Sequence, residues 1–400
     1  MIVYFGGLRG VLKEYIKYGY KIFWVIREYD YVLSDSEINV NKIILSKLNV
    51  DEVLCFLTKH KFKKNIHCVS YHDDYHDIAV EISARLGGSC NIKSNSNLIS
   101  KNKTLSRDLS NKIFDIFIKF HEKKEDSTID HILNMSFPII SKPINGTGSK
   151  DIKLLQNKHE LELLFEKLTT STLFEEYIHG VEFSVDSISK DGIHKVLMIA
   201  EKRLFDGTFV EKSHLIGTKK SKEIWFIVEK KVTAYLNAIG YIDGMSHIEV
   251  KILDDKISFI ECQLRMGGDY LWEAYNIITG SSLVDLSFKS DQDENFEISE
   301  LKTTLHSDEI VIIEFFSWNI ESGNLLYWSG IEEAENIDGV YLIKTMDNID
   351  ICKHPVSSSR DRDLVIILKG NDFEKMELDK NKVIEKIRPV VKIKVKSEEL

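Results

Sequence analysis

The chain has 400 residues, of which 43% are hydrophobic and 29% charged, and its 53 basic and 63 acidic residues give a net charge of −10. This length predicts two or three compact units, and the mildly acidic balance gives no electrostatic footprint for nucleic acid or an anionic membrane. No apolar run approaches the roughly 20 residues that span a bilayer, the N-terminus lacks a signal-peptide pattern, and five scattered cysteines favour reduced thiols. We therefore expect a cytoplasmic protein that binds neither nucleic acid nor membrane.

The first 90 residues alternate between two kinds of periodicity. Short apolar runs predict strands at 2–5, 22–26 and 66–69, and apolar residues at helical spacing predict helices at about 50–57 and 78–86. Strands that alternate with helices are typical of a parallel, doubly wound sheet. We therefore expect a Rossmann-like unit at the start of the chain.

Two local motifs in this unit resemble ligand sites but have simpler interpretations. Gly6-Gly7 follows the first strand, and because no GxGxxG pattern is present we interpret it as a tight strand-to-helix turn. The run YHDDYHD at 71–77 contains residue types that ligate metals. Acids at this position also suit the N-terminus of a helix, which is the interpretation we favour.

A glycine-rich loop follows the next strong strand. Lys103 and Arg107 lie one helical turn apart, and a weakly patterned helical segment continues to about residue 135. The strand at 137–141 then leads through Lys142-Pro143 into Asn-Gly-Thr-Gly-Ser at 145–149. A strand follows the loop, so this is not the strand–loop–helix of a Walker A site, yet its backbone N–H groups can cover phosphates. An ordinary hairpin turn is the alternative.

The middle of the chain contains a hairpin with acids on both strands. Before it come an apolar strand at 173–178, a strand at 183–188 and an amphipathic helix at 225–239. The hairpin has strands at 247–253 and 257–262, joined by a tight turn.

This hairpin brings charged groups together for a chemical reason. Glu249 and Glu261 fall near one another across the two strands, and Gln263 and Arg265 follow at once. Facing carboxylates repel unless a cation lies between them, and Mg²⁺ prefers hard oxygen ligands. The hairpin therefore predicts a magnesium site, with an exposed charged hairpin as the alternative.

The pattern changes again near the C-terminus. Residues 271–287 are helical in pattern, and 289–309 are polar and acidic. After them we expect a separate α+β lobe with strands at 310–318, 340–344, 364–369 and 390–395 and a helix at 380–387.

Taken in order, these motifs resemble the ATP-grasp superfamily, most strongly over residues 95–290. The resemblance implies a mixed α/β and α+β fold. Its domains would be an N-terminal Rossmann-like (pre-ATP-grasp) domain at 1–95, an ATP-grasp domain of two α+β subdomains at 96–288, and a small C-terminal α+β lobe at 289–400.

The resemblance also implies a role for each motif. Two lysines and the glycine loop would contact the phosphates, the strand at 173–178 would hold the adenine edge, and the acid of the Gly-x-Glu step would bind the ribose. These residues are Lys103, Lys142, Gly146, Gly148, Ser149, Glu175, Tyr177, Ile178 and Glu182. Glu249, Glu261 and Gln263 match the metal ligands, although Gln263 stands where the family usually has Asn. Arg265 matches a catalytic arginine.

Within the superfamily the chain is most similar to the L-amino acid ligases that form dipeptides. The similarity rests on Ser-His-Ile-Glu-Val at 246–250, on the run at 261–269, and on the acid- and lysine-rich segment at 201–214. It implies that His214, Gly267 and Gly268 contact substrate; for His214, a surface-loop histidine is the alternative.

The resemblance implies an enzyme that joins a carboxylate to an amine through an acyl phosphate, using ATP and Mg²⁺, with Mn²⁺ as a substitute. Amino acids are the expected substrates, and a homodimer is the default assembly. The alternatives are an ATP-grasp ligase or carboxylase-like enzyme acting on another carboxylate, and an ATP-binding protein without turnover.

Overall fold

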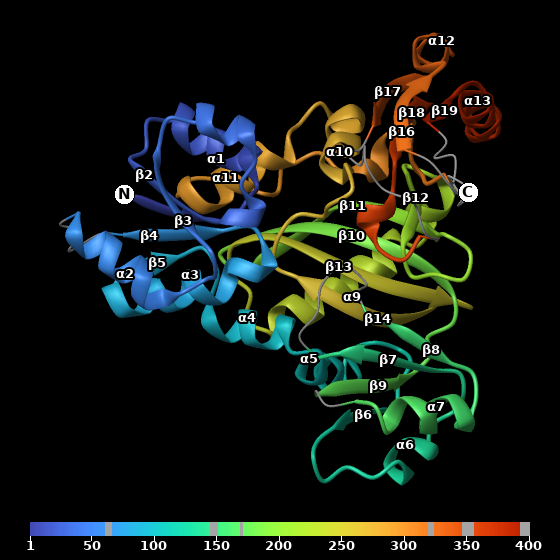
Figure 1. The fold of residues 1–400 in the computed structure, drawn as a ribbon, viewed down its shortest axis with the longest axis horizontal. Helices are drawn as coiled ribbons and strands as arrows, with labels where there is room; N and C mark the ends of the chain where they lie inside the picture. Colours follow the sequence, from blue (N-terminus) through green and yellow to red (C-terminus); the bar gives the residue numbers. More distant parts are fainter. Residues whose placement is uncertain (61–65, 145–150, 169–170, 319–323, 346–355, 393–400) are drawn as a thin grey trace, which may run out of the picture.

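The computed structural model describes residues 1–60, 66–144, 151–168, 171–318, 324–345 and 356–392. Within these ranges the strands form sheets of five, four, eight and two strands. Figure 1 shows the five-stranded sheet at the left, the eight-stranded sheet across the centre and the four-stranded sheet below it. No helix in these ranges is long and apolar enough to cross a bilayer.

The N-terminal sheet is parallel, as the alternating pattern predicts, with the order β3-β2-β1-β4-β5. Its two faces bury separate apolar cores. The sequence interpretation missed β3, whose residues are partly exposed, and the two-residue β5. The elements are β1 (Ile2–Phe5), α1 (Arg9–Lys17), β2 (Ile22–Arg27), β3 (Asn41–Leu45), α2 (Val50–Lys59), β4 (His67–Ser70), α3 (Asp73–Leu86) and β5 (Ser89–Cys90), with 3-10 turns at Glu28–Asp30 and Leu33–Glu37.

The run at 71–77 is the start of a helix, as expected. His72 is the N-cap of α3, and its side chain accepts a hydrogen bond from the Asp74 amide. Asp73 and Asp74 occupy the first turn, where carboxylates favour the positive end of the helix dipole.

The four-stranded sheet has the order β6-β9-β7-β8. The expected continuation of a helix to about residue 135 is wrong, because the polar segment β6 pairs with β9 as an edge strand. That pairing joins residues 49 to 55 positions apart, so the local pattern does not reveal it. The elements are α4 (Ser94–Lys101), α5 (Lys103–Ser110), β6 (Phe120–Lys123), α6 (Asp130–Leu133), β7 (Ile139–Pro143), β8 (Lys153–Leu155), α7 (Lys158–Phe165) and β9 (Thr172–Glu176).

The eight-stranded sheet has the order β14-β13-β10-β11-β12-β15-β18-β17. β15 pairs with β12 and so continues the central sheet across the expected boundary at 288/289, and the domain limits stay a prediction. The elements are β10 (Val181–Lys190), β11 (Ile193–Leu204), β12 (Glu211–Ile216), α8 (Lys219–Glu223), α9 (Trp225–Ala238), β13 (Gly244–Leu253), β14 (Lys256–Gln263), β15 (Ile310–Phe316), β17 (Val340–Thr345) and β18 (Leu364–Gly370).

The remaining elements flank these sheets. The expected helix at 271–287 is two helices, because Gly280 adopts a left-handed conformation between them. A two-stranded sheet pairs β16 with β19. The elements are α10 (Leu271–Thr279), α11 (Leu283–Gln292), β16 (Asn324–Ser329), α12 (Ile331–Glu335), α13 (Phe373–Lys386) and β19 (Arg388–Lys392), with 3-10 turns at Thr304–His306 and Ser359–Asp361.

The central sheet has one apolar and one polar face, and this places the site. On β10 and β13, the apolar side chains Phe183, Val185, Ile248 and Val250 belong to the core that α9 covers. Residues between them in the sequence point to the opposite face because side chains alternate along a strand. The intervening residues are Glu182, Ser184, Asp186, His247, Glu249 and Lys251.

Candidate active site

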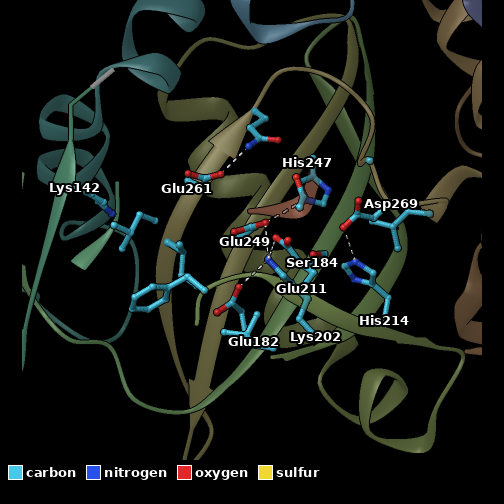
Figure 2. A pocket seen from close by; sticks show the side chains of 18 of the residues that line it. Lys142, Glu182, Ser184, Lys202, Glu211, His214, His247, Glu249, Glu261 and Asp269 are labelled. Atoms are coloured by element: carbon cyan, nitrogen blue, oxygen red, sulfur yellow. Dashed lines mark hydrogen bonds and ion pairs between the residues drawn. The ribbon is translucent and has the colours of Figure 1, made fainter. Parts of the chain in front are cut away.

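The polar face of the central sheet forms the wall of a cavity of about 250 Å³ (Figure 2). Strands β10 to β14 supply most of its lining, and α5 and β7 supply one lysine each. Its charged, histidine and amide residues are Lys103, Lys142, Glu182, Lys202, Glu211, His214, His247, Glu249, Glu261, Gln263, Arg265 and Asp269.

The two glutamates of the hairpin face each other as the sequence predicts. Glu249 on β13 is the register partner of Glu261 on β14. The turn between the strands consists of Asp254 and Asp255, both with positive φ. Directly opposed residues on antiparallel strands have side chains on the same face, about 5 Å apart at Cβ.

The environment treats the two glutamates differently. Burial raises the pKa of the Glu249 carboxyl, but Lys202 and His247 outweigh burial and hold that pKa well below its usual range. Burial and the neighbouring Glu249 raise the pKa of Glu261. The side-chain amide of Gln263 donates a 2.6 Å hydrogen bond to Glu261 Oε1, which leaves its own carbonyl oxygen as an acceptor.

Lys202 is a buried cation at the centre of this face. Its Nζ lies 2.8 Å from Glu182 Oε1, 2.8 Å from Glu249 Oε1 and 3.3 Å from Glu211 Oε1. Figure 2 shows the three glutamates pointing toward Lys202. Burial lowers the pKa of Lys202, but the three glutamates raise it well above its usual value. Lys202 therefore holds these carboxylates together as one charged group.

His247 links the hairpin to β10. Its Nδ1 lies 3.3 Å from Asp186 Oδ2, and its Nε2 lies 3.6 Å from Glu249 Oε1. Burial lowers the pKa of His247, and the two carboxylates raise it to about 9. The Gly267 amide donates a 2.6 Å hydrogen bond to Asp186, and a Cβ at Gly267 would lie 2.7 Å from His247 Nδ1, so this position requires glycine.

A second buried charge cluster lies where β7, β9 and α5 meet. Glu175 forms ion pairs with Lys142 and with Arg107, whose Nε lies 3.0 Å from Glu175 Oε2. Arg107 also donates to the carbonyl oxygens of Phe259 and Ile260 on β14. Burial raises the pKa of Glu175, but Arg107 and Lys142 lower it to about 2. Arg107 thus ties the four-stranded sheet to the hairpin.

Arg265 reaches from the hairpin to the N-terminal unit. Its Nε lies 2.6 Å from Asp73 Oδ2 at the start of α3, and its Nη1 donates to the Met266 carbonyl. Within the described part of the chain its Nη2 has no hydrogen-bond partner. Because Arg265 lines the cavity, this fixed guanidinium can offer a donor to an anion there.

The far end of the cavity contains a third cluster. Both carboxylate oxygens of Asp269 pair with Arg362, at 2.6 and 2.8 Å, and His214 Nε2 lies 3.3 Å from Asp269 Oδ2. These partners hold the pKa of Asp269 far below its usual range although burial raises it. His214 is buried on β12 and is not in a surface loop.

The structure brings most of the expected site residues to one place. Lys103, Lys142, Glu182, His214, Glu249, Glu261, Gln263, Arg265 and Gly268 line the cavity. Glu175, Tyr177, Ile178 and Gly267 are not among the described lining residues. Glu175 is buried and pairs with Lys142, Tyr177 and Ile178 follow β9, and the Gly267 amide donates to Asp186. Gly146, Gly148 and Ser149 lie outside the described residues. The functional roles expected for all of these residues stay predictions.

Sequence reasoning missed several residues of the site. Asp186 and His247 could have been recognised in the sequence, because they continue the pattern of polar residues at every second position on β10 and β13. Lys202 and Glu211 lie in the 201–214 segment, but the neighbouring sequence does not indicate which residues they pair with. Asp73, Arg107 and Arg362 pair across 192, 68 and 93 positions, which no local pattern reveals.

The oxygen atoms of the site can supply part of the coordination shell of a divalent cation, with a bound phosphate supplying the rest. Among the described residues, no group of three or more His, Cys, Asp or Glu side chains is arranged to hold a metal ion. Glu249, Glu261 and the Gln263 carbonyl are hard oxygen donors that can supply part of a coordination shell. Mg²⁺ usually takes one or two carboxylates and completes its shell with phosphate oxygens and water.

We compared the chain with models of known protein families and with curated proteins. Residues 135–273 match the family model of the ATP-grasp domain. No curated protein matches the chain.

The fold is shared with solved structures along nearly its whole length. L-amino acid ligase from Bacillus licheniformis superposes with a TM-score of 0.80 at 18% identity, covering 98% of each chain. Phosphoribosylglycinamide synthetase from Anaerococcus prevotii gives 0.72 at 15% identity, covering 98% of this chain and 99% of its own. The biotin carboxylase domain of 2-oxoglutarate carboxylase from Hydrogenobacter thermophilus, solved with MgADP and bicarbonate, gives 0.71 at 11%, covering 98% and 91%. The expected fold class is confirmed: residues 135–273 match the ATP-grasp domain, and the chain as a whole shares the fold of these solved structures.

Proposed function

We propose that the protein is an ATP-dependent ligase that joins a carboxylate to an amine through an acyl phosphate and releases ADP and phosphate. One observation carries the proposal: Glu249 and Glu261 face each other in a cavity that Lys103, Lys142, Lys202 and Arg265 also line. A cavity lined by two facing carboxylates and by several cations suits a metal–triphosphate substrate. The carboxylates can bind the metal ion, and the cations can bind the phosphate groups.

The residues of the cavity address the main barrier of the reaction. A carboxylate must attack the γ-phosphate of ATP, and both groups are anions. Lys103 and Lys142 supply positive charge on the side of the cavity next to the four-stranded sheet. Glu249, Glu261 and Gln263 would hold Mg²⁺, or Mn²⁺ in its place, which when bound neutralises phosphate charge.

Arg265 is the residue we assign to the transferred group. Asp73 and the Met266 carbonyl fix its guanidinium, so little reorganisation is needed when charge develops. It would stabilise the phosphoryl group during transfer, and later the oxyanion that forms when the amine attacks the acyl carbon. Removing one such donor typically costs about 100- to 1,000-fold in rate.

Amino acids are the substrates that we infer first. The support is the fold shared with the L-amino acid ligase together with the charged end of the cavity at His214 and Asp269. An ATP-grasp enzyme acting on another carboxylate is the second candidate, since the same fold occurs in the 2-oxoglutarate carboxylase domain solved with bicarbonate. A nucleotide-binding protein without turnover is the third.

Phosphate release from ATP separates these candidates. The protein is incubated with ATP and Mg²⁺, first with single amino acids and other carboxylates, then with amino acids in pairs. Release that requires a particular pair, together with the dipeptide in the mass spectrum, is the expected result. Release with a carboxylate other than an amino acid would favour the second candidate, and nucleotide binding without any release would refute both enzyme proposals.

The variant Glu261→Gln tests the metal assignment. It keeps the size of the side chain but removes the charge that faces Glu249, so we expect turnover to fall by about 100-fold or more while the melting temperature stays close to wild type. The matched control is Glu223→Gln, at an exposed position on α8, which should turn over normally. A Glu261→Gln rate within about twofold of wild type would refute the assignment.

A further inference from the structure

A second cavity, of about 190 Å³, lies beside the site at the outer edge of β14. It shares Lys103, Ile260, Glu261 and Gln263 with the first cavity. β14 is the first strand of the central sheet, and among the described strands it pairs only with β13. The two spaces therefore meet around the residues of β14 that we assign to metal binding.

The remaining walls of the second cavity come largely from the N-terminal side of the chain. Asp73 and Asp74 from the start of α3 and Ser100 and Lys101 from the end of α4 line it, and Lys101 donates to the Asp73 carbonyl. Arg265 lines the first cavity and Asp73 lines the second, and their ion pair at 2.6 Å stands between the two. A molecule in the second cavity would thus lie next to the guanidinium that we assign to the reacting group.

The charges around this cavity have both signs. Asp74 pairs with Arg27 through one carboxylate oxygen, Oδ2, at 2.8 Å. Lys101 donates to Asp77 and to the Asp73 carbonyl, and an ammonium group has three donors. Both side chains are about one-third exposed, so each can contact a small molecule as well as its protein partner.

We propose that the second cavity binds the amine substrate, and that this substrate is a small zwitterionic amino acid. The inference rests on the proposed ligase function. The ammonium group would face Asp73 and Asp74, and the carboxylate would face Lys101. A volume of 190 Å³ holds about six water molecules, which suits a small amino acid better than a peptide.

From the second cavity, the amine would approach the acyl phosphate in the first cavity, and this defines the amide-forming step. The ammonium group first gives one proton to water. The lone pair of the nitrogen then attacks the acyl carbon of the acyl phosphate in the first cavity and forms the C–N bond. The C–O bond to phosphate breaks, its electron pair leaves with the phosphate, and the second nitrogen proton passes to that phosphate.

Two variants test the two charges separately. Asp74→Asn removes a wall carboxylate, while Arg27 keeps Asp30 as a partner at 2.6 Å, so the fold is retained. We expect KM for the amine to rise about tenfold, with KM for ATP within about twofold of wild type. Lys101→Met should raise KM for an amino acid about tenfold but not KM for its amide, which has no carboxylate.

Matched controls come from ion pairs elsewhere. Asp51→Asn removes a carboxylate that also pairs with an arginine, Arg85, and Lys112→Met removes a lysine paired with Asp108. None of these residues lines either cavity, so both controls should keep the wild-type KM for the amine. Melting temperatures of all four variants report whether the fold is kept.

Hydroxylamine trapping separates failure of this inference from failure of the function. Hydroxylamine converts an acyl phosphate to a hydroxamate without the amine substrate. If wild type forms hydroxamates but Asp74→Asn and Lys101→Met leave KM for the amine unchanged, or raise KM for ATP equally, the second cavity is not the amine site. If wild type forms no hydroxamate with any carboxylate, the ligase proposal itself is wrong, and the inference with it.

Discussion

At the scale of single residues, Lys202 determines the charge of the site. It replaces what would otherwise be three mutually repelling carboxylates with a compact group of one cation and three anions. Each of these side chains is less than one-fifth exposed, and unpaired charge is costly in such a place. The arrangement keeps Glu249 ionised and fixed beside Glu261.

The variant Lys202→Met should therefore destabilise the protein. It leaves Glu182, Glu211 and Glu249 without their shared cation, and we expect the free energy of unfolding to fall by about 3–5 kcal/mol. Urea denaturation measures this change. Lys219→Met, which removes an exposed lysine paired with Glu223, should alter stability by less than about 0.5 kcal/mol. Equal stability of the two variants would contradict the role of Lys202.

Because of Glu175, the free energy of unfolding should fall as the pH becomes acidic. Its pKa in the folded protein is about 2, below the usual 4.5, so its ion pairs stabilise the fold fully above pH 4.5 and are lost as pH falls towards 2. Across that window the loss is about 3 kcal/mol.

Glu175→Gln isolates this contribution. The variant leaves Arg107 and Lys142 without an anion at neutral pH, so it should be less stable than wild type there. The difference should shrink as pH falls from 4.5, because wild-type Glu175 then becomes neutral as well. Urea denaturation at a series of pH values checks this, and a difference independent of pH would refute it.

At the scale of elements, the β13–β14 hairpin sets the register that opposes the two acids. Asp254 and Asp255 form its two-residue turn, both with positive φ, which matches the type I′ turn that favours Asn-Gly. A bulge between Glu249 and Val250 then adjusts the pairing beyond the turn. The turn alone would pair Glu249 with Ile260, so the turn and the bulge together place Glu249 opposite Glu261. The two turn residues have strained backbone conformations.

Relieving that strain should stabilise the hairpin. In Asp255→Gly the residue at φ +60° has no Cβ, and we expect the free energy of unfolding to rise by about 0.5–1 kcal/mol. Asp255→Val, a β-branched residue at the same φ, should lower it. Thermal unfolding of both variants gives the comparison, and a stabilising valine would show that the turn has another conformation.

At the scale of the whole molecule, several polar contacts among the described residues join the N-terminal sheet to the rest of the chain, and two of them involve buried carboxylates. One is the Asp73–Arg265 pair beside the site. The other is centred on Asp291 at the end of α11, which accepts hydrogen bonds from Tyr15 and His67. Phe288 on the same helix stacks on Tyr18 at 4.5 Å. The position of the N-terminal sheet, and so of Asp73 and Asp74, depends on both contacts.

Asp291→Asn should loosen this junction. We expect a loss of about 1–3 kcal/mol of stability, because the neutral amide is a weaker acceptor for Tyr15 and His67 in a buried place. Amide hydrogen exchange should rise in α1 and β4, which hold these partners. Asp285→Asn on the same helix, whose carboxylate pairs with Lys289 near the surface, is the control and should leave exchange in β4 unchanged. Unchanged exchange in both variants would refute the role of Asp291.

The sequence by itself determined the local structure that the site depends on. Alternating apolar and polar residues predicted the strands at 247–253 and 257–262, and the turn between them predicted that Glu249 and Glu261 lie near one another. In the structure the turn has two residues, and the bulge between Glu249 and Val250 shifts the register by one residue so that Glu249 faces Glu261. The parallel N-terminal sheet followed from the same kind of pattern. These features are readable because strand periodicity and turn chemistry act between neighbours in the chain.

Only the tertiary structure decided which distant side chains meet. Nothing near Lys202 in the sequence indicates Glu182 or Glu249, nothing near Arg265 indicates Asp73, and nothing near Asp269 indicates Arg362. The polar segment 120–123 likewise became a strand only by pairing with β9. Such contacts arise when whole sheets and helices pack together, so they depend on the order of strands and the docking of units rather than on any local pattern.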